Sequence, residues 1–284
     1  MSAIEERLDE KKRAVERALA ACLAGEDSVL FRAMRHAVLS GGKRFRPLLL
    51  LAAAERCGAG LEEALPFACG LELIHNYSLV HDDLPVMDDD DWRRGRPTVH
   101  KAYGEPIALL AGDALLTLAF EVMAGAAAPG GLASRRAEAI ALIARRAGAS
   151  GMIGGQVLDI DFRSETESEA AYEELMLRKT GGLIMAAAET GAILGGASAE
   201  DRARFTEFGK RLGLAFQLRD DLQDAAPRDD RSGFRPNAAA FLGAAAARAR
   251  VAELHRAAIG GLEGTGLLTE ELRALALSLE IRTA

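Results

Sequence analysis

Cysteine and aromatic residues are scarce in this sequence. Only three of its 284 residues are cysteines, and Cys22, Cys57 and Cys69 form no CxxC pair. Such spacing argues against a disulfide-stapled secreted fold and suits reduced thiols in a cytoplasmic protein. Aromatic residues make up 5% of the chain and hydrophobic residues 49%, with alanine and leucine prominent. This mixture is typical of a helical core built from small and branched aliphatic side chains.

The chain also lacks an excess of positive charge and an uninterrupted apolar run. Its net charge is −7 and its pI is about 5.4, which argues against a nucleic-acid-binding surface. The first twenty residues are charged and carry no signal-peptide core. The longest apolar run, residues 106–128, contains Asp113 and Glu121, whereas a spanning helix needs about 20 nearly uncharged residues. We therefore expect a helix in a large soluble core and no membrane span.

No stretch alternates as a strand does, and nearly every segment shows the 3.6-residue helical period. The pattern predicts helices over residues 2–24, 26–39, 45–57, 61–83, 105–127, 132–151, 168–178, 182–195, 199–224, 238–259 and 267–281. Glycine pairs and prolines separate these segments. Since no polar linker is long enough to divide the chain, residues 1–284 are expected to form one all-α domain.

The first acidic cluster follows an apolar helix, in HDDLPVMDDDDWRRGRPT at residues 81–98. Leu71, His75, Ser78 and Asp82 share one stripe of that helix, at steps of four, three and four. Asp83 and Asp88 complete a DDxxxxD pattern. A solvated acidic face is the ordinary alternative, but this cluster continues an apolar helix and not a charged one.

A second acidic cluster, FQLRDDLQD, places Gln217, Asp220, Asp221 and Asp224 on one helical face. Two carboxylates about 4 Å apart repel by roughly 4 kcal/mol at an effective dielectric near 20. Hard divalent cations relieve such repulsion, and Mg²⁺ takes one or two carboxylates together with phosphate oxygens and water. Two clusters of this kind favour a Mg²⁺ site that holds a phosphorylated ligand.

Basic residues accompany both clusters, as binding of phosphate requires. Lys43 and Arg46 lie one turn apart in GGKRFRP, behind two glycines. Arg93 and Arg94 follow the first cluster, and RKTGG supplies Lys179 and Thr180. Each is weak evidence alone, because surface lysine and arginine are common, but together they indicate a diphosphate site.

With these motifs in this order, the sequence resembles the short-chain trans-polyprenyl diphosphate synthase family, most like its bacterial farnesyl diphosphate synthases. DDLPVMD resembles the family's first aspartate-rich motif in bacterial form, and RRGRPT the arginine segment after it. GGQVLDI and RKTGGLI match the elements in the middle of the chain, and DDLQD the second aspartate-rich motif. The resemblance implies a single domain of long helices around a deep central cavity, usually in a homodimer.

The resemblance also implies roles for individual residues. It implies about three Mg²⁺ ions per active site with diphosphate bound, held by Asp82, Asp83, Asp88, Asp220, Asp221 and Asp224. Arg93, Lys179 and Lys210 would contact the allylic diphosphate, with Thr180 and Gln217 near the carbocation. Lys43, Arg46, His75 and Arg94 would hold isopentenyl diphosphate, beside Gln156 and Asp159.

The implied activity is Mg²⁺-assisted ionisation of an allylic diphosphate, dimethylallyl or geranyl, and its condensation with isopentenyl diphosphate. Tyr77 and Ser78, just before the first motif, would limit product length, and an aromatic residue at Tyr77 resembles farnesyl synthases. On an ideal helix, however, Ser78 lies about 40° from Asp82 and Tyr77 about 140° away. Farnesyl diphosphate is the expected product, and geranylgeranyl or geranyl diphosphate the alternative.

One departure from the family follows the second motif, where relatives carry a loop with a lysine. This chain has no lysine after Lys210, although Arg228, Arg231 and Arg235 follow. Arginine and lysine are not interchangeable there. Two other functions stay open: a terpene cyclase, which would not use isopentenyl diphosphate, and a non-catalytic subunit of a synthase.

Overall fold

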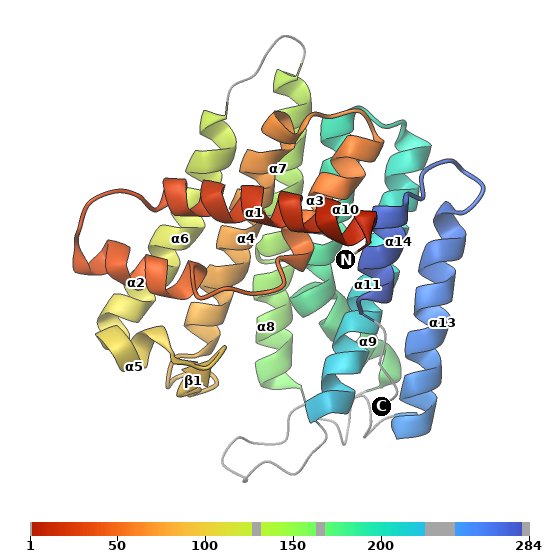
Figure 1. The fold of residues 1–284 in the computed structure, drawn as a ribbon. Helices are drawn as coiled ribbons and strands as arrows, with labels where there is room; N and C mark the ends of the chain where they lie inside the picture. The colour runs from red at the N-terminus through yellow and green to blue at the C-terminus, as the bar shows by residue number, and fades with distance from the viewer. Residues whose placement is uncertain (1, 127–131, 163–167, 225–241, 280–284) are drawn as a thin grey trace.

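The computed structural model describes residues 2–126, 132–162, 168–224 and 242–279 as a bundle of helices (Figure 1). The predicted all-α class is confirmed. The α-helices are α1 (Ala3–Cys22), α2 (Val29–Val38), α3 (Phe45–Arg56), α4 (Leu61–Asp82), α5 (Val99–Tyr103), α6 (Glu105–Gly125), α7 (Ala133–Ala147), α8 (Met152–Asp161), α9 (Glu169–Met176), α10 (Gly182–Gly195), α11 (Ala199–Asp224), α13 (Ala244–Leu262) and α14 (Glu270–Leu277). A π-helical turn, η1 (Leu177–Gly181), joins α9 to α10.

Several helices begin at a residue whose side chain caps the first turn. Ser28, Ser168 and Thr269 each accept a backbone hydrogen bond from the first turn of α2, α9 and α14. Helix α7, in contrast, begins at Ala133, and its N-cap residue Leu132 provides no side-chain cap. The ends of most predicted helices match the structure to within a few residues.

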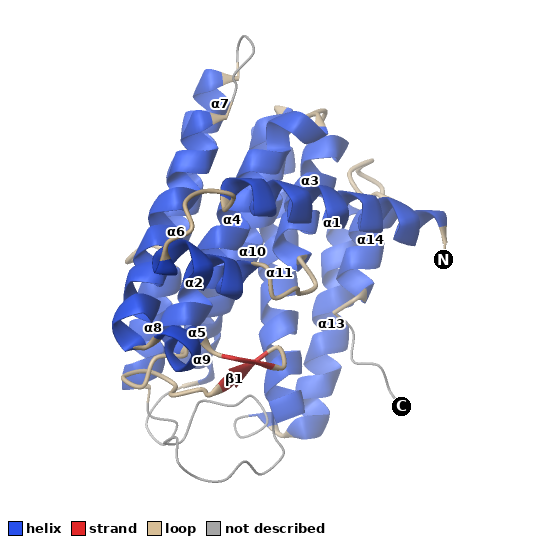
Figure 2. Cartoon of the chain, turned by 60° about the vertical axis from the view of Figure 1, so that its left-hand side comes forward, coloured by secondary structure: helices blue, strands red, loops and turns tan. Residues whose placement is uncertain are grey.

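Three elements were not predicted from the sequence. A two-stranded antiparallel hairpin pairs β1 (Trp92–Arg93) with β2 (Arg96–Pro97), and it lies beside α5 (Figure 1 and Figure 2). The short helix α5 follows it. Helix α8 covers a segment whose glycines gave no clear helical signal, and it carries Gln156 and Asp159.

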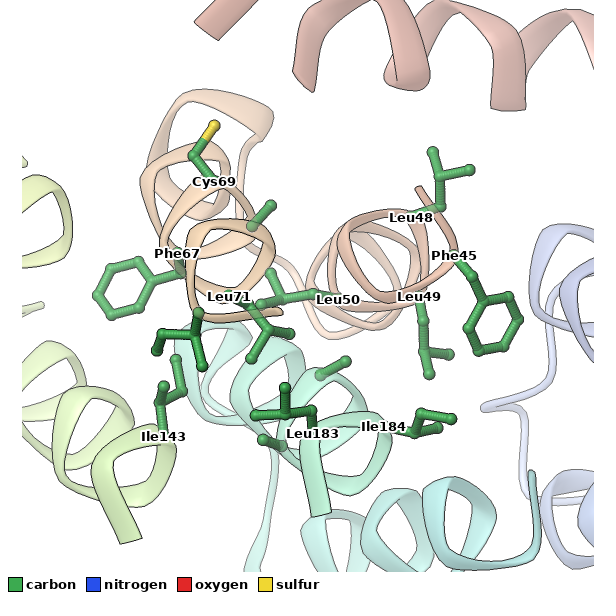
Figure 3. Packing of buried hydrophobic residues seen from close by; sticks show 14 of the residues in the cluster. Phe45, Leu48, Leu49, Leu50, Phe67, Cys69, Leu71, Ile143, Leu183 and Ile184 are labelled. Atoms are coloured by element: carbon green, nitrogen blue, oxygen red, sulfur yellow. The ribbon is translucent and has the colours of Figure 1, made fainter. Parts of the chain in front are cut away.

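The centre of the core lies where α3, α4 and α10 meet (Figure 3). Leu49, Leu50, Leu71 and Ile184 are fully buried there, and Ile143 adds to the same cluster from α7. Helix α1 lies across the bundle and buries Val15 and Leu19 (Figure 1). Nearly all side chains in the middle of α10 are buried, which explains why that helix is apolar on every side.

Helix α6 is long and apolar enough to cross a membrane by length and composition, and 33% of its most apolar window is buried. It packs against α4, α2 and α5. Leu109 and Leu110 remain about half exposed, at 48% and 53%. The helix is thus less buried than the sequence led us to expect.

Glycine at position 191 allows α10 to lie directly against α3. A Cβ atom built on Gly191 would lie 2.8 Å from the Cβ of Ala53 and 2.8 Å from the backbone nitrogen of Ala54. Both neighbours are parts of a packed helix and cannot move independently. Close contact between the two backbones at this crossing therefore depends on glycine.

We predict that Gly191→Ala lowers the free energy of unfolding by about 1–3 kcal/mol, because the added methyl group forces α3 and α10 apart. Gly260→Ala is the matched control, since Gly260 lies in α13 with no atom within 4 Å of its built Cβ. That variant should gain about 0.5–1 kcal/mol from helix propensity. Denaturant unfolding measures both, and a neutral Gly191→Ala would contradict the close crossing.

Candidate active site

A cavity of about 1090 Å³ brings together most of the residues that the sequence marked. Its lining comes from α3, α4, the segment after α4, α6, α8, η1, α10 and α11. Of the predicted site residues, it contains Arg46, His75, Tyr77, Ser78, Asp82, Asp88, Arg93, Arg94, Gln156, Lys179, Thr180, Gln217 and Asp220. The two acidic motifs, more than a hundred residues apart in the sequence, therefore face one cavity.

In the first motif, neighbouring aspartates point in different directions. Asp82, at the end of α4, lines the cavity, and burial raises its pKa to about 7 against the opposing charges of Lys179 and Arg93. Asp83 is 3% exposed and accepts a hydrogen bond of 2.7 Å from Arg93 Nε. Consecutive helical residues differ by about 100°, so both cannot face the same space.

In the second motif, too, neighbouring aspartates point in different directions. Asp220 lines the cavity and is held by Arg219, whose Nη2 lies 2.8 Å from its Oδ1. Arg219 in turn stacks on Phe216 at 4.8 Å, a pairing that the sequence reading missed. Asp221 is 6% exposed and hydrogen-bonded to Tyr172 and to Gln217 Nε2.

The glycine-rich turn before α3 places cationic groups at the cavity. Gly41 and Gly42 have φ angles of +86° and +140°, which favour glycine. Arg94 packs against Gly42 and donates to the carbonyl oxygen of Gly41, joining this turn to the hairpin. Arg46 lines the cavity, and burial lowers its pKa.

His75 faces the same group of arginines. Burial, and then Arg46, Arg94, Arg93 and Arg44 in decreasing order, holds its pKa well below the usual 6.5. A neutral imidazole beside several cations offers one donor and one acceptor to a ligand without adding charge.

A buried ion pair behind this turn was also missed by sequence reasoning. Arg44, at φ +52° and 3% exposed, donates to Glu72 Oε1 at 2.7 Å and to the carbonyl oxygen of Val38 at 2.7 Å. Asn76 donates to the carbonyl oxygen of Glu72 at 2.8 Å. These contacts fix the turn that carries Arg46 to the helix that carries His75. The only sequence signal was a glutamate within an apolar helix.

The π-helical turn η1 presents Lys179 and Thr180 to the cavity. Lys179 Nζ is hydrogen-bonded to Asp159, and Thr180 Oγ1 donates to Gln217 Oε1 at 2.7 Å. A Cβ atom on Gly155 would lie 2.7 Å from the Cα of Lys179, so α8 reaches η1 only through a glycine. Turns of this kind are frequent at functional sites.

Some predicted residues are not brought to the cavity. Lys43 is exposed and Lys210 half-buried, and neither is among the lining residues. Lys210 lies ten residues before Asp220 on α11, about 15 Å along the helix axis. Asp83 and Asp221 face away from the cavity, and their assignment as metal ligands stays a prediction. The side chain of Asp224, and the loop with Arg228, Arg231 and Arg235, fall outside the described residues.

Tyr77 and Ser78 both line the cavity, although ideal geometry favoured only Ser78. The cavity extends past α4 towards α6 and α8, where Leu109, Ile153 and Val157 add apolar lining. The Tyr77 ring is 5% exposed and meets His81 edge-on at 5.7 Å. Its hydroxyl oxygen is buried and has no hydrogen-bond partner among the described residues, so the tyrosine acts there as a large apolar wall.

A further group of possible metal ligands lies outside this cavity. Oxygen atoms of Asp89 and Asp91 and a ring nitrogen of His100 lie within 4.8 Å of one another. The ammonium group of Lys101 is 2.7 Å from Asp91 and already offsets its charge. Sequence reasoning did not mark this group, because His100 gave no signal of a ligand.

The cavity combines carboxylates, cationic groups and an apolar section. Asp82 keeps a raised pKa although Lys179 and Arg93 are near, which means that these cations do not fully compensate the buried negative charge. Hard oxygen donors with uncompensated charge fit Mg²⁺, and the arginines fit phosphate oxygens. The arrangement suits a ligand with a diphosphate head and a hydrocarbon tail.

Comparisons with known proteins agree with this chemistry. The family model described as polyprenyl synthetase matches residues 27–233. Farnesyl diphosphate synthase of Geobacillus stearothermophilus is 41% identical over 232 residues, covering 81% of this chain and 78% of that protein. Geranylgeranyl diphosphate synthase of Cyanophora paradoxa is 43% identical over 232 residues, covering 80% and 76%. The crystal structure of an FPP/GFPP synthase from Zymomonas mobilis has a TM-score of 0.88 and 34% identity, covering 97% and 98%.

His75 yields a prediction on pH dependence. The folded protein holds it neutral, whereas the unfolded chain takes up a proton below about pH 6.5, so this group removes stability as the pH falls below that value. Each pH unit of this difference corresponds to about 1.4 kcal/mol. In denaturant unfolding, we expect the free energy of unfolding to fall between pH 7.5 and pH 5.5 in both proteins. The fall should be about 1.4 kcal/mol smaller in His75→Gln than in wild type. Identical pH dependence in the two proteins would contradict a neutral His75.

Proposed function

The chain belongs to the polyprenyl synthetase family, and we propose that it makes farnesyl diphosphate. As a prenyl diphosphate synthase it is a trans-prenyltransferase. Specifically, we propose that an allylic diphosphate, dimethylallyl or geranyl, ionises and is condensed with isopentenyl diphosphate. The observation that carries the proposal is that carboxylates of both acidic motifs line one cavity together with arginines, a lysine and apolar side chains.

The allylic diphosphate is proposed to lie between the two motifs. Asp82, Asp88 and Asp220 would hold Mg²⁺, and the fit rests on their oxygen donors and on the uncompensated charge of Asp82. Bound Mg²⁺ would act as a Lewis acid that stabilises charge on the leaving diphosphate. Arg93 and Lys179 line the same cavity and would contact this diphosphate as it gains negative charge.

The diphosphate of isopentenyl diphosphate is proposed to lie on the other basic group. Arg46 and Arg94 supply positive charge there, and neutral His75 supplies a hydrogen bond. The hydrogen bond from Arg44 to Glu72 holds the turn before Arg46 against α4, the helix that carries His75. Lys43 is exposed and does not line the cavity, and its contact with this diphosphate stays a proposal.

The carbocation needs protection from water and a negative electrostatic environment. Thr180 and Gln217 present oxygen atoms at the cavity wall, and the leucine, isoleucine and valine lining excludes other nucleophiles. Gln156 lines the wall nearby. No nucleophilic side chain is required, and the released diphosphate is the proposed base for the final proton.

The Tyr77 ring, a large side chain in the cavity wall formed by α4, supports a product of fifteen carbons. Geranylgeranyl diphosphate is the second candidate, because similar relatives carry both product names. We further propose a homodimer, supported by the apolar and partly exposed surface of α6 at Leu109 and Leu110. We also propose a cytoplasmic location, because the three cysteines are free thiols and the cytoplasm keeps thiols reduced.

Chromatography of the products of wild-type protein tests this function. With Mg²⁺, geranyl diphosphate and isopentenyl diphosphate, we expect farnesyl diphosphate and one released diphosphate per condensation. Turnover of the allylic substrate without isopentenyl diphosphate, to a hydrocarbon product, would instead indicate a terpene cyclase. A well-folded protein with no turnover under either condition would indicate a non-catalytic subunit.

We predict that Asp82→Ala and Asp220→Ala each reduce turnover by about 10³-fold, because each removes a carboxylate from the cavity. Circular dichroism should show that helicity is retained. Asp113→Ala is the control, since Asp113 is 62% exposed on α6 and does not line the cavity. Normal turnover in either cavity variant would remove the basis for the metal assignment.

We predict that Tyr77→Ala lengthens the product, because loss of the ring widens the cavity at the wall formed by α4. Ser78→Ala is the comparison and should leave chain length unchanged, since it removes only a hydroxyl group that donates to the carbonyl oxygen of His75. Product chromatography with excess isopentenyl diphosphate measures both. A longer product from Ser78→Ala alone would assign the stop to Ser78.

A further inference from the structure

Tyr172 on α9 places its hydroxyl group inside an apolar cluster. The residue is 2% exposed, and its ring meets Phe162 edge-on at 5.9 Å. Leu175, Leu214 and Leu218 belong to the same cluster. A buried phenol of this kind needs a hydrogen-bond partner. The partner is the carboxylate of Asp221, to which the Tyr172 hydroxyl donates.

The second oxygen of Asp221 determines how the Gln217 amide is oriented. Gln217 Nε2 donates to Asp221 Oδ1 at 2.8 Å, one helical turn along α11. An ionised carboxylate only accepts hydrogen bonds, so the NH₂ end of the amide must face it. A flipped amide would bring its oxygen against the carboxylate, with two acceptors and no proton between them. The carbonyl end of Gln217 therefore faces the opposite direction.

That opposite direction is the cavity wall. Gln217 Oε1 accepts from Thr180 Oγ1 at 2.7 Å, and both residues line the cavity. Because Thr180 donates its only hydroxyl proton to Gln217, the remaining lone pairs of its oxygen are free to face a ligand. Both groups thus present negative ends of dipoles, which stabilise a developing cation.

We propose that Tyr172 is a positioning residue, which through Asp221 fixes the polarity of the Gln217 amide at the cavity. Without the hydroxyl group, Asp221 loses one of its fixed contacts in the apolar cluster and can turn away from Gln217. The amide can then present its NH₂ group to the cavity, where positive hydrogens oppose a cation. This inference rests on the proposed function for its catalytic meaning, but the hydrogen-bond relay itself does not depend on it.

The same relay gives Asp221 a role distinct from that of Asp220. Asp220 lines the cavity, whereas the Asp221 carboxylate is directed towards α9 and Gln217. Asp221 thus acts on the reaction through the orientation of an amide. Loss of the Tyr172 hydroxyl should consequently affect the rate of ionisation and not the requirement for metal.

The kinetic test is Tyr172→Phe, which keeps the ring against Phe162 and removes only the hydroxyl group. We expect kcat to fall by about tenfold, as for loss of one hydrogen bond to a charged group. The KM values for both substrates and the Mg²⁺ dependence should stay within about twofold, since neither diphosphate subsite changes. Tyr103→Phe is the matched control, because Tyr103 lies outside the cavity with its ring against His36.

A double-mutant cycle separates this role from a purely structural one. If Tyr172 acts through Asp221, then Tyr172→Phe combined with Asp221→Asn should be no slower than Asp221→Asn alone. Additive losses would overturn the proposal. So would a kcat for Tyr172→Phe within twofold of wild type. A raised Mg²⁺ requirement in Tyr172→Phe would overturn it in favour of Asp221 as a direct metal ligand.

A measurement without turnover tests the relay itself. The chain has only three glutamines, Gln156, Gln217 and Gln223, so ¹⁵N-glutamine labelling gives three side-chain amide pairs in an NMR spectrum. Gln217→Met assigns the Gln217 pair by its disappearance. We expect slow hydrogen exchange of that pair in wild type and exchange about tenfold faster in Tyr172→Phe. Unchanged exchange would overturn the relay, whereas absent turnover in wild type would overturn only the proposed function.

Discussion

Carboxylates held away from bulk water lose the hydration that stabilises their charge, and this cost is the constraint on which the cavity depends. Asp82 lies at the end of an apolar helix, and its burial raises its pKa to about 7 although Lys179 and Arg93 are near. The fold limits the negative charge in the cavity, because one aspartate of each adjacent pair is directed towards partners outside it. Asp83 pairs with Arg93, and Asp221 accepts from Tyr172 and Gln217. Fewer negative groups therefore face the cavity than the sequence contains.

Close approach of helix backbones brings these groups within reach of one another. Gly155 lets α8 touch η1 beside Lys179, and Gly213 lets α11 touch Gly181, where an added Cβ would lie 2.6 Å from the Gly181 Cα. Side chains on η1 and α11 can then form the hydrogen bond between Thr180 and Gln217. Small residues thus hold the two walls of the cavity together, while large apolar residues fill the core behind them.

Buried polar pairs behind the cavity orient the side chains that line it. Arg44 and Glu72 fix a strained turn to α4, so that Arg46 and His75 face the same space. On the other side, Tyr172 and Asp221 fix an amide. In each case a buried charge keeps its hydrogen-bond partners, without which burial would cost several kcal/mol. The reacting groups are positioned by residues that themselves need not touch a ligand.

The sequence by itself determined the helical class, most helix positions and the two acidic motifs, because helical period and i, i+4 spacing are local properties. It also marked the residues of the family resemblance, and the chain's membership of that family is shown by comparison. Sequence could not find α8, whose glycines lower helix propensity and whose stability comes from packing on η1. Nor could it show that Lys210 does not line the cavity, or that Tyr77 and Ser78 both do. Which of two adjacent aspartates faces the cavity depends on partners from distant helices, and only the tertiary structure brings those partners together.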